Sequence, residues 1–231
     1  MTTQTTPAHR PDLEAPISSP ASRLRRRFGA LCLPATFLVM LVGTPLLDPL
    51  DDRANESKTL HQAIGHASQI SGLGWAEILT GVLTIAGLMT IVGAIRERGA
   101  GWANATGVIT VISSAGLIGI ALNHFVIAGL TSSTLTMPQR VEALTRFHHA
   151  GGPIVVLIMI GAVPFVTAAV AAWRSGMTSP LILVPAIALL VASTAPGDAG
   201  EYASQAAGLV TAAWLARDLL RTTMSDLPVA R

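Results

Sequence analysis

The chain has 231 residues, of which 51% are hydrophobic and only 12% are charged. Soluble domains carry about 25% charged residues, so this composition excludes an ordinary soluble enzyme and a disordered chain. The formal net charge is +2 and basic residues cluster only near the N-terminus, so we expect no nucleic-acid partner. The composition predicts one small domain that crosses a membrane several times.

The first 27 residues are polar, rich in Pro, Ser and Thr, and end in four arginines: Arg23, Arg25, Arg26 and Arg27. They hold too few apolar side chains to build a core, so we predict a disordered basic cytoplasmic tail over residues 1–27. The apolar run from Phe28 to about Leu47 is long, and no small-residue cleavage pattern follows it. It predicts an uncleaved first transmembrane helix rather than a signal peptide.

Five further apolar segments follow, roughly at residues 72–95, 104–130, 151–173, 180–195 and 200–219. Most reach the ~20 residues that cross a bilayer, and lipid offers no partner to backbone polar groups, so they should be helices. The fifth span of the chain is short and contains Pro185, which predicts a tilt or kink. We therefore predict an all-α bundle of about six transmembrane helices over residues 28–220, followed by a cytoplasmic C-terminal tail over residues 221–231.

The basic residues predict the orientation of this bundle. With the N-terminus in the cytoplasm, eleven of the 15 Lys and Arg residues lie on the inner side and four on the outer side. Cytoplasmic loops are enriched in Lys and Arg, so we expect both termini inside and a multi-pass protein of a bacterial plasma membrane.

Two connectors on the predicted outer side carry helical patterns. Residues 57–70 place Leu60 and Ile64 on one face, and residues 138–149 begin with Pro138, which predicts the first turn of a helix there. They are either plain connectors with local helix or short amphipathic lids on the membrane surface.

Ionisable side chains are costly inside a membrane and need a reason. Under the predicted orientation, they all lie near the outer ends of the spans: Glu77, His124, His148, His149, Asp198 and Glu201. We expect no comparable group in the inner half, so any chemistry should sit at the outer level.

The last span carries a polar stripe. Asp198, Glu201, Tyr202 and Gln205 are spaced i, i+3, i+4 and i+7, which puts them on one helix face. Asp198 alone is explained equally well as a helix cap. A cap does not explain Gln205, two turns deeper, so the stripe should face a cavity or another helix.

Each polar residue of the earlier spans has a plainer alternative. Glu77 is either a cavity acid or an interfacial carboxylate, in water or paired with Arg146. Asn123 is either a ligand contact or a hydrogen-bonding group between helices, and His124 is either functional or a packed neutral histidine. His148 and His149 point about 100° apart on a helix, so they form no ready-made metal site.

We expect neither a metal nor another cofactor. The sequence has no HxxxH or HExxH motif, and its single cysteine, Cys32, excludes an intrachain disulfide and a cysteine-based metal site.

Acid chemistry is the most specific function that these residues predict. A carboxyl group in an apolar cavity has a raised pKa and can act as a proton donor, while a second carboxylate serves as base. We assign these catalytic roles to Glu77 and to Asp198 or Glu201. The predicted substrate-binding residues at the same level are Trp75, Asn123, His124, Phe125, His148, His149, Tyr202 and Gln205, although the aromatic ones also fit a membrane-interface belt.

The segments GWAEIL, around Trp75 and Glu77, and GDAGEY, from Gly197 to Tyr202, resemble the small integral-membrane terpene cyclases of bacterial and fungal secondary metabolism. That resemblance implies a metal-independent isomerase that protonates a prenyl chain, with Glu77 as proton donor and Asp198 or Glu201 as its partner. Over residues 28–220 the chain also resembles six-helix actinobacterial membrane proteins, through its helix pattern and acidic outer loop, and this second resemblance implies no activity.

Three functions follow as hypotheses. The first is a membrane enzyme that cyclises a prenyl or terpenoid substrate. The second is a small transporter, or a resistance or immunity protein, for a lipophilic compound. The third is a non-catalytic structural subunit. The expected partners are membrane lipids and a lipophilic small molecule, and an oligomer is compatible with all three hypotheses.

Overall fold

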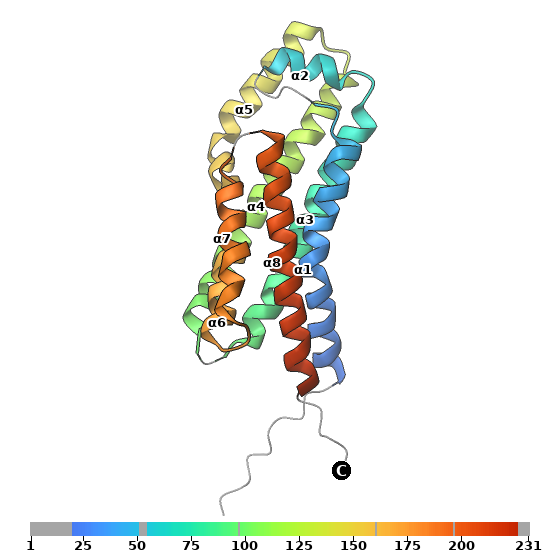
Figure 1. Cartoon of the computed structure of the whole chain (residues 1–231). Helices are drawn as coiled ribbons and strands as arrows, with labels where there is room; N and C mark the ends of the chain where they lie inside the picture. The colour runs from blue at the N-terminus through green and yellow to red at the C-terminus, as the bar shows by residue number, and fades with distance from the viewer. Residues whose placement is uncertain (1–19, 51–54, 97, 160, 196, 226–231) are drawn as a thin grey trace, which may run out of the picture.

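The computed structural model describes residues 20–50, 55–96, 98–159, 161–195 and 197–225, with side chains except at 20–21, 152–159, 198 and 223–225. This part of the chain is helical throughout and contains no strand (Figure 1). The elements, in chain order, are α1 (Pro20–Leu47), α2 (Glu56–Ala63), α3 (Ala67–Ala94), α4 (Ala100–Thr131), α5 (Met137–Met159), α6 (Val163–Arg174), η1 (Pro180–Ile182), α7 (Leu183–Ala192) and α8 (Asp198–Ser225).

In the part of the chain that the structure describes, three helices are long and apolar enough to cross a membrane: Ser22–Leu47 within α1, α3 and α4, with 26, 28 and 32 residues. At about 1.5 Å per residue, each exceeds the ~30 Å thickness of the hydrocarbon core. Helix α3 packs against α1 on one side and α4 on the other, and α8 packs on α1. These three helices contain the first three predicted spans.

Helix α1 begins earlier than the sequence predicts. It starts at Pro20, so the four basic residues between Arg23 and Arg27 lie in its first two turns rather than in an irregular tail. Arginine is a good helix former, and a membrane helix can continue into the polar interface. Residues 1–19 and 226–231 of the two predicted tails lie outside the described residues.

The predicted fourth span, 151–173, does not form one uninterrupted helix. Its first part belongs to α5, which also contains the connector 138–149, and its second part is α6, which starts at Val163. Pro164 sits in the first turn of α6, where its missing N–H costs nothing, whereas an unbroken helix would need that N–H. The Pro185 of α7 likewise lies in a first turn, directly after η1, so it ends no helix.

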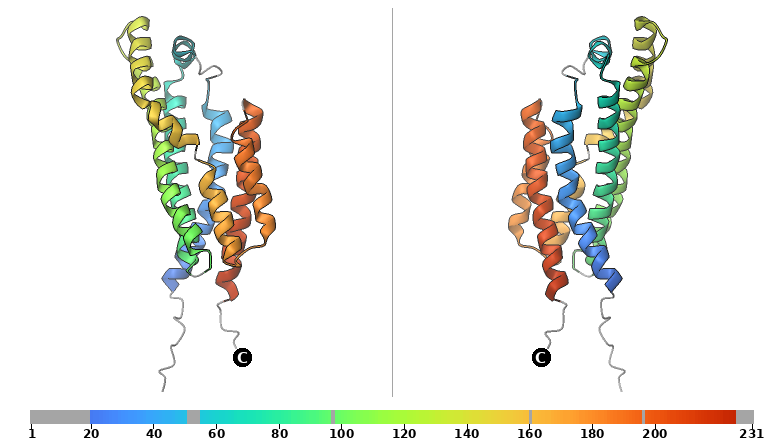
Figure 2. Two further views of the ribbon diagram at one scale, coloured as in Figure 1. Left: turned by 90° about the vertical axis from the view of Figure 1, so that its left-hand side faces the viewer. Right: turned by 90° about the vertical axis from the view of Figure 1, so that its right-hand side faces the viewer.

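Helix α2 and the first half of α5 form a cap over the ends of α3 and α4 (Figures 1 and 2). The cap has a small apolar core of its own, which includes Leu60, Ile70, Ile127 and Leu144. Asn55 begins α2 by accepting hydrogen bonds from the N–H groups of Ser57 and Lys58. Thus 57–70 is one short helix, a turn and the start of α3, and 138–149 has become part of a longer helix.

The start of α1 and the end of α8 lie together at the end of the bundle opposite the cap (Figure 1). We call this the terminal end and the other the cap end. Between them, a second core joins α1, α3, α4, α6, α7 and α8. It is rich in alanine, which lets the helices approach closely and leaves the larger residues to shape the space between them.

Candidate functional site

A cavity of about 800 Å³ lies between helices α1, α3, α4, α6, α7 and α8. Asp48 and Leu50, which follow α1, and Gly197, which precedes α8, belong to its wall, so it lies in the half toward the cap end. Binding pockets generally measure about 300–1,000 Å³, so this one has room for a drug-sized molecule. Its larger apolar wall residues are Phe37, Met40, Leu117, Phe165 and Leu189.

Helix α8 contributes the polar pair of this cavity. Glu201 and Gln205 both line it, and Gln205 Nε2 donates to Glu201 Oε1 at 3.1 Å, one turn apart on α8. Gln205 is 7% exposed, and its Oε1 is buried with no hydrogen-bond partner. Leaving such an acceptor unsatisfied costs roughly 1–3 kcal/mol, so this atom is suited to receive a hydrogen bond from a bound molecule.

The other residues of the predicted stripe on α8 differ from this pair. Tyr202 is 45% exposed and is not part of the cavity wall. Asp198 is the first residue of α8, and its side chain lies outside the described ones. The structure therefore brings together Glu201 and Gln205.

Glu77 lies elsewhere, in a contact between α3 and α4. Its Oε2 is 2.8 Å from Nδ1 of His124, and the two residues are 4% and 1% exposed. Gly74 permits this close approach, because a Cβ there would lie 3.1 Å from the carbonyl oxygen of Ala121. Glu77 is not among the cavity-lining residues, so the structure does not place it opposite Glu201 across that space.

The alternative that Glu77 is an interfacial carboxylate paired with Arg146 is wrong. Glu77 is buried, and Arg146 contacts Glu142 on its own helix. A hydrogen bond between a histidine and a carboxyl group gives each polar group a partner, which allows both to be buried. The pair therefore joins α3 to α4, two helices long enough to cross a membrane.

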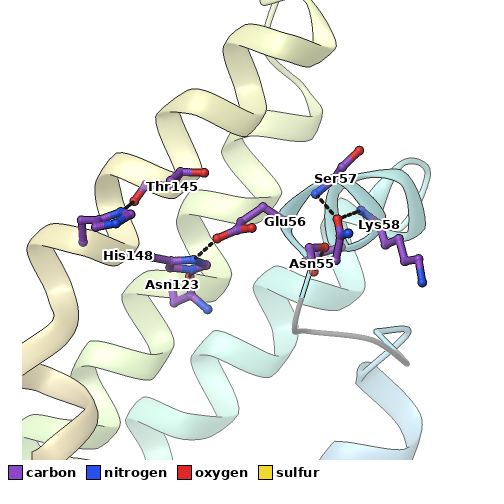
Figure 3. Close-up of polar contacts among 9 residues, drawn as sticks. Asn55, Glu56, Ser57, Lys58, Asn123, Thr145 and His148 are labelled. Carbon is purple, nitrogen blue, oxygen red and sulfur yellow. Dashed lines mark hydrogen bonds and ion pairs between the residues drawn. The ribbon is translucent and has the colours of Figure 1, made fainter.

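His148 and Asn123 belong to a polar cluster at the cap (Figure 3). His148 Nε2 is 3.0 Å from Asn123 Oδ1 on α4, and its Nδ1 is 3.5 Å from Glu56 Oε1 at the start of α2. Three elements thus meet at one imidazole ring. The neighbouring His149 turns away, with Nδ1 2.7 Å from the carbonyl oxygen of Thr145.

The Glu56 carboxyl makes the cap sensitive to acid. Its pKa is lowered from 4.5, because a hydrogen bond from its own backbone and one from His148 favour the charged form. A carboxyl group with a lowered pKa stabilises the folded state at pH values above its pKa in the unfolded chain. This stabilisation is lost as the pH falls through the lowered pKa of the folded state. We therefore expect the α2 amides to exchange faster below about pH 4 than intrinsic rates predict. Hydrogen exchange of the wild type and Glu56→Gln measures this, and an equal acid response in both would contradict it.

The predicted aromatic residues are peripheral to the cavity. Trp75 is 65% exposed, and its ring meets Phe125 edge-on with centroids 5.4 Å apart. Neither residue lines the cavity, where Phe37 and Phe165 lie with ring centroids 4.8 Å apart.

Two further acidic residues, Asp48 and Asp218, lie at cavities that the sequence did not predict. Asp48 lines the cavity, although it follows a predicted span and reads as part of an acidic loop. Asp218 is 8% exposed near the terminal end, where it accepts a hydrogen bond of 2.6 Å from Thr178. The expectation that the other half of the bundle has no comparable group is therefore wrong. The signal for Asp218 was an acidic residue inside the predicted span 200–219.

Asp218 also lies in a second pocket of about 530 Å³, which Arg217 and Arg221 line. Within the described ranges, no three His, Cys, Asp or Glu side chains are grouped so as to hold a metal ion. Comparison of the chain with protein-family models, with curated proteins and with solved structures finds no match.

Proposed function

We propose that the protein is a multi-pass protein of the plasma membrane that binds a lipophilic small molecule in the cavity of its cap-end half. The single observation that carries this proposal is an 800 Å³ space between six helices, with a mostly apolar wall and one buried acceptor without a partner. Such a site suits a small transporter, or a resistance or immunity protein that sequesters or moves a lipophilic compound.

Six crossings with both termini in the cytoplasm form part of this proposal. The start of α1 and the end of α8 share one end of the bundle (Figure 1), as an even number of crossings requires. The turns that join α3 to α4 and α6 to α7 lie at that same end and carry Arg96, Arg98 and Arg174. A basic terminal end supports its placement in the cytoplasm, with the cavity in the outer half.

Binding is tested with a neutral fluorescent lipophile, Nile red, and purified protein in zwitterionic nanodiscs. Ser193 is an exposed residue of α7's end that lines the cavity, so Ser193→Trp should fill the space without disturbing the core. We expect saturable binding by the wild type and about tenfold weaker binding by this variant. Ile187→Trp is the matched control, because Ile187 is 52% exposed on α7 and does not line the cavity.

Absence of saturable binding by the wild type would overturn the proposal and favour a structural subunit. Equal binding by Ser193→Trp and the wild type would place the site elsewhere and would overturn the assignment to this cavity.

Acid-initiated cyclisation of a prenyl or terpenoid substrate is a second candidate. The observation that favours it is the presence of two carboxyl groups, Glu201 and Asp48, in the wall of one mostly apolar cavity. In this version Glu201 protonates the prenyl chain, Asp48 receives a proton, and Glu77 with His124 supports the helices. Membranes incubated with farnesylated or geranylated acceptors should then yield a cyclised product that Glu201→Gln abolishes. No product from wild-type membranes would count against the enzyme.

A further inference from the structure

The hydroxyl groups of the cavity wall present hydrogen-bond acceptors rather than donors. Six hydroxyl groups lie in its wall: Thr36, Thr80, Thr84, Ser113, Ser193 and Ser204. Each donates its hydrogen to a backbone carbonyl of its own helix, at 2.8–3.1 Å. A hydroxyl whose hydrogen is committed in this way can still accept through its oxygen. These groups therefore present acceptors to a bound molecule.

Gln205 adds a further acceptor whose orientation is fixed. Its Nε2 faces the Glu201 carboxylate, which only accepts, so the amide cannot be turned over without setting two oxygens against each other. Its Oε1 therefore points away from Glu201 and is the buried atom without a partner. Hydrogen bonds from charged donors are stronger than those from neutral ones, and most of all where water is excluded.

The charges of the wall have one sign. Glu201 and Asp48 line the cavity, whereas no Lys or Arg does so among the residues that the structure describes. The phenyl rings of Phe37 and Phe165 also line the cavity, and an aromatic ring attracts a cation that lies over its face. A neutral lipophile without an N–H or O–H group would leave the acceptors unpaired, and an anion would be repelled.

We infer that the cavity selects a lipophilic cation with N–H donors, an alkylammonium or similar amine, whose head donates to Gln205 Oε1 beside the Glu201 carboxylate. This inference names the ligand class of the proposed function and rests on it. The apolar tail lies against Phe37, Met40 and Leu117, and the ammonium lies at the wall of α8.

Four probes of one chain length test the inference by displacement of Nile red from the protein in zwitterionic nanodiscs, with empty nanodiscs to correct for partition into lipid. They are dodecylammonium, dodecyltrimethylammonium, dodecanol and dodecyl sulfate. We expect dodecylammonium to bind about tenfold more tightly than the quaternary cation, which has no N–H group. The alcohol and the anion should bind more weakly than the quaternary cation.

Two variants separate the hydrogen bond from the charge. Gln205→Leu should bring the affinity for dodecylammonium close to that for dodecyltrimethylammonium without weakening the binding of the quaternary cation. Glu201→Gln should weaken the binding of both cations, because it removes a negative charge from the wall. Glu201 is exposed, so its replacement leaves the core intact. Thr211→Val is the matched control, since Thr211 is a buried polar residue of α8 that does not line the cavity, and it should keep the wild-type order.

The failures of the two proposals are distinguishable. If Nile red binds and Ser193→Trp blocks it, but the alcohol or the anion competes as well as dodecylammonium, the inferred ligand class is wrong while the proposed binding function stands. If Nile red itself shows no saturable binding, both the proposed function and this inference are wrong.

Discussion

Replacing Glu77 by leucine should destabilise the protein by about 3–5 kcal/mol, because His124 then remains buried without its partner. Both residues are almost completely inaccessible, and their contact joins α3 to α4 at 2.8 Å. Glu77→Gln keeps a hydrogen-bonding group of the same length and should cost less, about 1 kcal/mol. Unfolding of the purified protein in detergent, followed by circular dichroism during titration with a denaturing detergent, measures both.

A double-mutant cycle distinguishes an interacting pair from two independent core residues. His124→Leu alone should be about as harmful as Glu77→Leu, whereas Glu77→Leu with His124→Leu should cost clearly less than the sum of the two, since no polar group is then left unpaired. Strictly additive effects would mean that the contact contributes nothing of its own. Arg146→Leu is the control, because this arginine forms only an exposed pair with Glu142 and should change stability little.

Adding one methyl group at position 208 should disturb both folding and binding. A Cβ on Gly208 of α8 would lie 2.0 Å from Cε1 of Phe37 on α1, so either the helices separate or the Phe37 ring moves. Phe37 lines the cavity and packs against Phe165. We expect Gly208→Ala to lower the free energy of unfolding by about 1–3 kcal/mol and to weaken Nile red binding at temperatures where the protein stays folded.

Gly93→Ala provides the comparison for this effect. A Cβ on Gly93 of α3 would meet nothing within 4 Å, so the substitution should leave binding unchanged and should stabilise the helix slightly. If Gly208→Ala were as stable as Gly93→Ala and bound the probe as well as the wild type, close contact of α1 with α8 would not shape the cavity.

The helices of membrane length could be predicted from the sequence because they depend on the local composition of the chain. In lipid, a run of about 20 apolar residues without charges forms a helix, whatever it packs against. The runs that end at Leu47, Ile95 and Leu130 therefore correspond closely to α1, α3 and α4. The period of the polar residues on α8 likewise placed Glu201 and Gln205 on one face before any neighbour of that face was known.

The boundaries between helices were harder to predict where two neighbouring helices have the same apolar composition. Hydropathy is summed over a window, so residues 151–173 read as one apolar span although the chain divides there into the end of α5 and the start of α6. The connector 138–149 joined α5 because its apolar side, with Leu144, packs into the core of the cap.

The amino-acid sequence by itself determined that the protein is helical, that the first three of its six predicted spans form helices of membrane length within the described residues, and which polar residues interrupt them. Only the tertiary structure decided which of these residues meet: Glu77 with His124 between two helices, and Glu201 with Gln205 at a cavity that Glu77 does not line. The physical reason is that residue spacing fixes the face of a helix on which a side chain lies. The rotation of that helix, and the neighbour it presents to the side chain, depend on the packing of the whole bundle.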